Sequence, residues 1–158
     1  MSRRKKVKSQ FESGTVYAIP LENGYSFCVV CVGNEFAFFD YLSKEAVIPD
    51  NLLNLPIAFR VFVGKGEPKY EKWIALGKVE LPEDYLKHSS FLHKPVGSEE
   101  YFIYSNGESL PASEDEVKGL ELFGIWFGPH IKDRLEEYYE GKPSSAVAAI
   151  KKQLGINF

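Results

Sequence analysis

Three short apolar segments separated by tight-turn signals dominate the first third of the sequence. All three are rich in β-branched and aromatic residues, which favour strands; they are residues 14–19, 25–32 and 35–41. Asn23-Gly24 lies between the first two segments, and Gly33-Asn34 lies between the last two. Asn-Gly is a strong signal for a hairpin turn, and turns this short join neighbouring antiparallel strands. The sequence therefore predicts a three-strand meander.

Later segments add further strands. Residues 57–63 alternate large apolar side chains with Ala58 and Arg60, as a half-buried strand does. Ser113 and Glu116 have the spacing of a capping box, which indicates the start of a short helix. Strands are also predicted at 100–104 and 119–127, and the apolar segment 73–79 has no clear period.

The end of the chain changes to a helical period. One helix is predicted over 131–139, with Ile131, Leu135, Tyr138 and Tyr139 on one face. A second is predicted over 144–154, with Ser144 as its cap, Gly155 after its end, and an apolar stripe of Val147, Ile150 and Leu154. The predicted fold is therefore α+β and mostly β: a twisted antiparallel sheet or a partly open small β-barrel, with one or two C-terminal helices.

Length and charge divide the chain into a basic tail and one acidic domain. A chain of 158 residues has the length of a single domain. Residues 1–10 carry five positive charges and no periodic pattern, which predicts a flexible basic tail before a globular domain at 11–158. Five of the 19 basic residues lie in that tail, so the domain keeps 14 basic against 22 acidic residues, a net charge of −8. An acidic body repels a nucleic-acid backbone and attracts a basic partner.

The two cysteines, Cys28 and Cys31, are predicted to be structural. A structural zinc site needs four ligands, and the sequence has no second pair of cysteines. Residues i and i+3 of a strand point to opposite faces, so these two side chains should be buried as small apolar groups rather than form a redox pair. We therefore expect no metal and no cofactor.

No motif in the sequence indicates catalysis. The three histidines, His88, His93 and His130, have no ligand or nucleophile at a recognisable spacing. The sequence contains neither a G-x-S-x-G nucleophile elbow nor a phosphate-binding G-x-x-x-x-G-K-[ST] loop. We therefore predict that the chain is not an enzyme, and an enzyme of unrecognised type stays as an alternative.

The sequence also predicts a cytoplasmic protein. The longest apolar run, residues 27–32, is too short to span a membrane, and no apolar segment follows the basic N-terminus as in a signal peptide. Two cysteines are too few for a disulfide framework, which fits a reducing compartment.

Several blocks resemble the Immunity protein 26 family of bacterial polymorphic toxin systems. The most specific is GTVYAIPL at 14–21, followed by NGY at 23–25. Weaker blocks follow in the same order: FRVFV at 59–63, Trp73 with LGKV at 76–79 and LP at 81–82, and GLE at 119–121. The resemblance covers about residues 11–140 and implies a β-rich protein that binds and neutralises a cognate toxin, often a nuclease. The resemblance implies no catalytic residue, and we expect Trp73 to be a core residue rather than a contact residue.

The resemblance and the acidic charge predict an immunity protein that occludes a basic toxin. Acidic side chains around an aromatic centre should hold the partner, because charge complementarity speeds association. The candidate toxin-binding residues lie in connections and strand starts: Glu83, Asp84, Glu114, Asp115, Glu116 and Glu121. The alternative is a small β-barrel regulator that binds nucleic acid through the basic tail.

Overall fold

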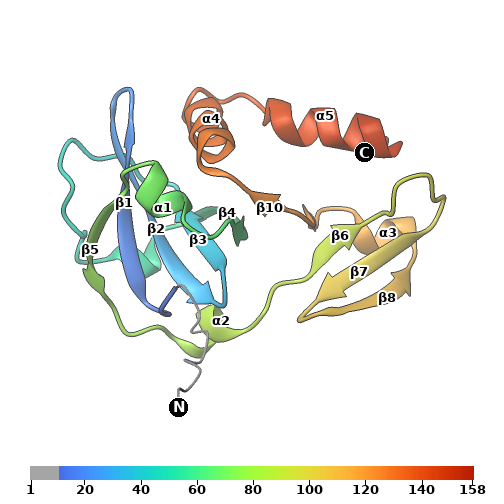
Figure 1. Cartoon of the computed structure of the whole chain (residues 1–158), viewed down its shortest axis with the longest axis horizontal. Helices are drawn as coiled ribbons and strands as arrows, with labels where there is room; N and C mark the ends of the chain where they lie inside the picture. The colour runs from blue at the N-terminus through green and yellow to red at the C-terminus, as the bar shows by residue number, and fades with distance from the viewer. Residues whose placement is uncertain (1–10) are drawn as a thin grey trace, which may run out of the picture.

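The fold is α+β and mostly β, as the sequence predicts. The computed structural model describes residues 11–158, so the predicted basic tail at 1–10 lies outside the described residues. The described chain forms two sheets that lie side by side (Figure 1). The larger has the strand order β10-β4-β3-β2-β1-β5 and the smaller has the order β8-β7-β6-β9. Both are open sheets rather than barrels, and each contains one parallel pair, β10 with β4 and β6 with β9.

The predicted meander forms the centre of the larger sheet. Its strands are β1 (Thr15–Leu21), β2 (Gly24–Val32) and β3 (Glu35–Phe39), joined by β4 (Ile57–Val63), β5 (Ile74–Lys78) and β10 (Ile125–Trp126). Strand β5 pairs with Thr15–Ala18 only, so Pro20 has a strand neighbour on just one side, where it faces Tyr25. A proline without an N–H fits such a position.

The larger sheet buries a separate core on each face. On one face, Ile131 and Leu135 of helix α4 (Gly128–Tyr139) pack with the buried side chains of β2, β3 and β4, and Trp73 joins this core. On the other face, Leu52 of the short helix η1 (Leu52–Asn54) and Tyr85 of helix α2 (Glu83–Leu86) cover the sheet. Helix α1 (Glu67–Tyr70) lies between β4 and β5 in sequence.

The two cysteines occupy these two different cores. Cys28 belongs to the core under α4, and Cys31 belongs to the core under η1 and α2. Both side chains are fully buried free thiols. The prediction that they point to opposite faces is confirmed.

The smaller sheet contains two strands that the sequence analysis missed, at residues 91–93 and 108–112. Its strands are β6 (Phe91–His93), β7 (Tyr101–Ser105), β8 (Glu108–Ala112) and β9 (Glu121–Leu122). The Asn106-Gly107 turn joins β7 to β8, and β8 escapes detection because its residues are exposed and include Pro111. Helix α3 (Glu114–Val117), with the predicted capping box of Ser113 and Glu116, packs on one face of this sheet.

The predicted strand at 119–127 is wrong as a single element. Leu122 ends β9 in the smaller sheet, where it pairs with Leu92. Ile125 begins β10 in the larger sheet, where it pairs with Phe62. Phe123 and Gly124 cross between the sheets, so an apolar run that reads as one strand is divided between two sheets.

The two C-terminal helices form close to their predicted bounds. Helix α5 (Ser145–Leu154) begins after Ser144, whose side chain accepts from the Val147 N–H, and ends at Gly155 with φ of 75°. Two predicted apolar contacts are wrong, since Tyr138 is 37% exposed and Ile150 is 40% exposed. No helix within residues 11–158 is long and apolar enough to cross a membrane.

Candidate functional site

A buried ion pair fixes helix α2 against the larger sheet. Glu35 on β3 is fully buried, and its carboxylate accepts from the Arg60 Nε on β4 and from the Ser89 hydroxyl. The Ser89 N–H donates to Glu35 Oε1 at 3.2 Å. Arg60 also donates from Nη2 to the carbonyl oxygens of Tyr85, at 3.1 Å, and Lys87. This network sets the position of α2 and of the chain that enters β6.

Helix α2 is tied on its other side to η1. The buried Tyr85 hydroxyl donates to the Leu53 carbonyl at 3.0 Å. Burial raises the pKa of Tyr85, so its hydroxyl stays protonated and keeps donating at neutral pH. Glu83, Asp84 and Leu86 of the same helix are exposed. The contacts thus present two carboxylates and a leucine on a helix held by its neighbours.

Beyond Ser89, aromatic side chains gather where the two sheets meet. Phe62 of β4 contacts Phe91 of β6 with a centroid distance of 4.9 Å. Phe123 lies 4.0 Å from Tyr104 and 6.1 Å from Phe62. His93 stands edge-on to Phe123 at 5.4 Å. Aromatic pairs at these separations attract one another, so the cluster also joins the sheets.

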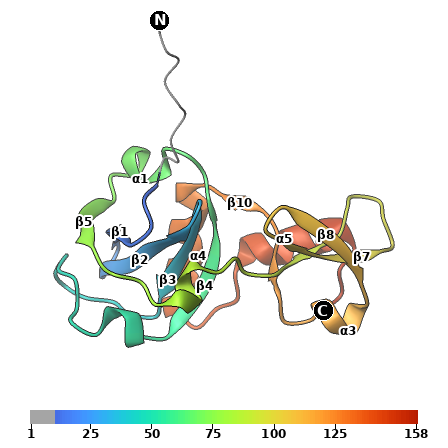
Figure 2. The same cartoon turned by 90° about the horizontal axis from the view of Figure 1, so that it is seen from below.

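The rings on β6 and β7 lie on the outer face of the smaller sheet. Tyr101 and Ile103 pack on the core under α3, so Phe102 and Tyr104 point to the opposite face. Phe102 pairs across the strands with His93, and Tyr104 pairs with Phe91, so His93 and Phe91 lie on that same face. Figure 1 shows α3 behind the smaller sheet, with β7 and β8 toward the viewer, and Figure 2 shows the same separation from below. Phe91 is buried. The other rings of the cluster are half-buried: Phe62, His93, Phe102, Tyr104 and Phe123.

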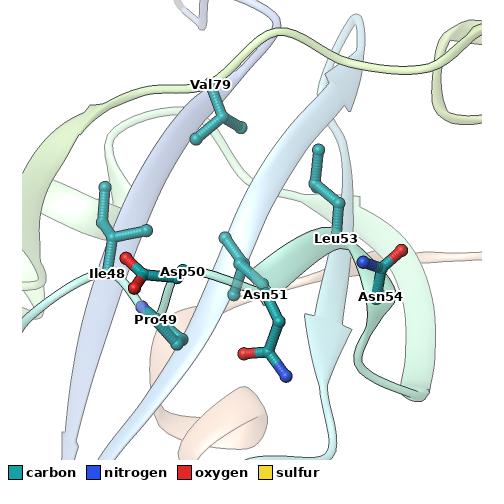
Figure 3. A pocket seen from close by; sticks show the side chains of 8 residues that line it. Ile48, Pro49, Asp50, Asn51, Leu53, Asn54 and Val79 are labelled. Carbon is teal, nitrogen blue, oxygen red and sulfur yellow. The ribbon is translucent and has the colours of Figure 1, made fainter.

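A hollow of about 440 Å³ lies at the other end of α2, beside η1. Its lining comes from the loop before η1, from η1 itself and from Val79 after β5: Ile48, Pro49, Asp50, Asn51, Leu52, Leu53, Asn54 and Val79. Figure 3 shows Val79 across the hollow from the loop residues, with Asp50 and Asn51 on the loop side. The hollow therefore combines apolar walls with one carboxylate and two amides.

We group the hollow, α2 and the aromatic rings under one name, the strip, because hydrogen bonds link them in turn. It consists of the hollow, the exposed residues of α2 (Glu83, Asp84 and Leu86), and the aromatic face (Phe62, Phe91, His93, Phe102, Tyr104 and Phe123). Tyr85 links the hollow to α2, and the network of Arg60, Glu35 and Ser89 links α2 to β6. The arrangement offers aromatic area together with acidic groups, and aromatic residues are enriched at protein interfaces.

The six predicted acidic residues do not form one cluster. Glu83 and Asp84 lie on α2, in the strip. Glu114 and Asp115 are exposed on α3, which Figure 1 places on the far side of the smaller sheet. Glu116 accepts from the Ser113 N–H at 2.8 Å and completes the capping box. Of the six, only Glu83 and Asp84 are exposed on an element that Arg60 ties to the chain entering β6.

Glu121 has a structural partner. Both of its carboxylate oxygens accept from Arg134 of α4, each at 2.9 Å. The Arg134 guanidinium also lies 4.0 Å from the centre of the Phe59 ring and 4.9 Å from that of Trp126. A bidentate pair stacked on two rings joins α4 to the smaller sheet and leaves Glu121 little freedom to bind a partner.

The two thiols and Lys94 are held inside the fold. Burial raises the pKa of the Cys28 thiol well above its ordinary value and that of Cys31 to about 11. Within residues 11–158, no three His, Cys, Asp or Glu side chains come together in a way that could hold a metal ion. Lys94 is buried and donates to the carbonyl oxygens of Ser98 and Leu154, the latter at 2.8 Å at the end of α5.

The aromatic face was not among the predicted site residues. Its signal was present in the sequence, because residues 101–104 are aromatic or apolar at every position and so provide an apolar side chain on both faces of β7. Sequence cannot show that α3 covers one face only. Comparison of the chain with protein-family models, curated proteins and solved structures gives no match.

Proposed function

We propose that this chain is a non-catalytic binding protein that neutralises a basic toxin protein by covering it with the strip. The observation that carries the proposal is the aromatic face of five half-buried rings. His93, Phe102 and Tyr104 lie on the sheet face opposite the one that α3 covers, and Phe62 and Phe123 contact them where the two sheets meet. Aromatic residues are enriched at the centres of protein interfaces, where they supply much of the binding energy. The resemblance of residues 14–25 to the Immunity protein 26 family supports the same reading.

The distribution of charge supports a basic partner. Residues 9–158 carry 14 basic and 22 acidic side chains, and Glu83 and Asp84 lie on α2, which Arg60 ties to the chain that enters β6. Acidic groups beside an apolar centre steer a basic protein into place and raise its association rate. A typical interface covers about 800 Å² on each partner, which is under a tenth of the 9486 Å² surface of this chain.

The proposal is tested with the product of the gene adjacent to that of this chain. The two proteins are co-expressed in a bacterial host, and complex formation is followed by co-purification and toxicity by growth. We expect a one-to-one complex and restored growth. Replacing Tyr104 with Ala should weaken the complex about tenfold or more, since an aromatic anchor contributes on the order of 2 kcal/mol. Tyr70, 74% exposed on α1 and outside the strip, provides the matched control Tyr70→Ala. Absence of a complex, or equal loss in both variants, would count against the proposal.

A second candidate function rests on the same rings. Half-buried aromatic residues on an open sheet can stack on the bases of single-stranded nucleic acid, and the basic residues 1–10 could contact phosphates. This alternative predicts that a fluorescent single-stranded oligonucleotide binds the full chain, with a steep salt dependence, and that deleting residues 1–10 removes the binding. The acidic body makes it the less favoured candidate.

A further inference from the structure

We infer that the hollow beside η1 receives an arginine side chain of the partner protein. This inference rests on the proposed function, because it assumes a basic protein as the partner. Nothing in the aromatic face or in α2 requires the hollow, so it is a separate subsite at the opposite end of the strip. The inference is carried by the shape of the hollow, by the chemistry of its lining and by its continuity with α2.

The hollow has the size and walls of a side-chain subsite. Its volume of about 440 Å³ falls within the range of small-molecule sites, about 300–1,000 Å³. Ile48, Leu52, Leu53 and Val79 supply apolar surface. Arginine places its aliphatic stem along such surface while its charged end stays near polar groups. The walls therefore suit the stem of a long cationic side chain.

The polar groups of the hollow suit a guanidinium. Asp50 is the only ionisable residue in its lining, and Asn51 and Asn54 add amide oxygens that can accept hydrogen bonds. Among residues 11–158, no basic side chain forms a salt bridge with Asp50. A guanidinium presents five N–H donors in a planar fork, which can reach a carboxylate and a neighbouring amide together. A negatively charged side chain would meet Asp50 as a like charge.

The position of the hollow connects it with the acidic part of the strip. The Leu53 carbonyl at its wall accepts from Tyr85, and Tyr85 lies on the same helix as Glu83 and Asp84. A partner that covers α2 therefore has the hollow within reach. Arginine is among the residues that most often dominate interface energetics when inserted in a pocket.

The test uses the full chain and two blocked tripeptides, acetyl-Leu-Arg-Leu-amide and acetyl-Leu-citrulline-Leu-amide. Citrulline has nearly the same shape as arginine but carries no charge. Each peptide is titrated into the isotopically labelled chain while backbone amide shifts are recorded by NMR. For the arginine peptide we expect shift changes centred on residues 48–54 and Val79, with a dissociation constant on the order of 1 mM. The citrulline peptide should bind about tenfold more weakly, because a hydrogen bond between charged groups is lost.

Matched variants isolate the role of Asp50. Asp50→Asn should weaken binding of the arginine peptide about tenfold. Glu45→Gln removes the same charge from an exposed position of the same loop outside the hollow lining, and should leave the affinity within about twofold. The inference is overturned if the shifts lie elsewhere, if citrulline binds equally well, or if Asp50→Asn has no effect.

Failure of this inference is distinguishable from failure of the proposed function. If the adjacent-gene toxin forms its complex while the arginine peptide leaves residues 48–54 unperturbed, the subsite is wrong and the binding function stands. If the peptide binds in the hollow as expected but no toxin complex forms, the subsite stands and the proposed function fails.

Discussion

The Glu35 carboxylate and the Arg60 guanidinium form an ion pair whose acidic side chain is completely buried and whose basic side chain is only 17% exposed. The pair joins β3 to β4, and Arg60 carries it further to the carbonyl oxygens of α2. Breaking a buried pair by removing one partner leaves the other charge desolvated without compensation. The strip therefore depends on a charge pair in the interior of the fold.

Replacing Glu35 with Ala should destabilise the fold strongly. The change leaves Arg60 without its carboxylate and the Ser89 N–H without its acceptor. Loss of one partner of a buried pair costs about 3–5 kcal/mol. Because Arg60 is partly exposed, we expect the free energy of unfolding to fall by about 3 kcal/mol. Urea unfolding measures the free energy directly. Glu12→Ala, which breaks an exposed pair with Lys78, is the control and should change stability little. Equal effects of the two substitutions would contradict this account of Glu35.

Tyr139 of α4 should contribute to stability through its hydroxyl. That oxygen accepts from the Tyr41 N–H at 3.0 Å and bonds the buried Ser26 hydroxyl at 2.7 Å. Tyr139→Phe keeps the ring but removes these partners, and each unsatisfied buried polar group costs about 1–3 kcal/mol. Thermal and urea unfolding should therefore show a loss of about 2 kcal/mol. Tyr138→Phe, at the exposed neighbouring position, serves as the control; a comparable loss there would rule out a specific role for the Tyr139 hydroxyl.

The buried thiols should make the fold less stable at alkaline pH. Burial raises the pKa of Cys31 from its ordinary value of 9.0 to about 11, and it raises that of Cys28 as well. Near neutral pH both thiols are almost fully protonated in the folded and unfolded states, so they give little pH dependence there. Between pH 9 and 11 the unfolded chain loses protons that the folded chain keeps, and the free energy of unfolding falls.

A variant with both cysteines replaced by Val isolates this effect from that of the tyrosines with raised pKa, such as Tyr139. Its stability between pH 9 and 10 should decline less steeply than that of the wild type. The native wild type should also react slowly with iodoacetamide at pH 8, and quickly once unfolded, because the reactive species is the thiolate. Rapid alkylation of either thiol in the native protein would be inconsistent with their burial.

Much of the local structure could be predicted from the sequence because turns, caps and periods are local signals. Asn23-Gly24 marked the first hairpin, Ser113 and Glu116 marked the start of α3, and Ser144 and Gly155 marked the ends of α5. The division of residues 119–127 between two sheets could not be predicted, since the partners of Leu122 and Ile125 lie about 30 and 60 residues earlier in the chain.

The candidate site was harder to predict, because exposure and partnership depend on distant contacts. The capping-box spacing already gave Glu116 a structural role, so this residue could have been left out of the predicted site. The partner of Glu121, Arg134, lies 13 residues away on another element, and no local pattern indicates the pair. Glu83 and Asp84 are exposed on α2, so their predicted role stays a prediction.

The most direct test of the proposed binding surface compares two pairs of acidic residues at corresponding positions of two short helices. Glu83 and Asp84 occupy the first turn of α2 in the strip, and Glu114 and Asp115 occupy the first turn of α3 outside it. Each pair is replaced by Gln and Asn, which removes two negative charges from a four-residue helix in both variants. Stopped-flow association with the adjacent-gene toxin, measured across a range of salt concentrations, then reports electrostatic steering. We predict that the Glu83→Gln/Asp84→Asn variant associates about tenfold more slowly at low salt, with a flatter salt dependence, while the Glu114→Gln/Asp115→Asn variant stays within about twofold of the wild type. An equal effect of the two variants, or a larger effect of the α3 variant, would contradict the assignment of the strip as the toxin-binding surface.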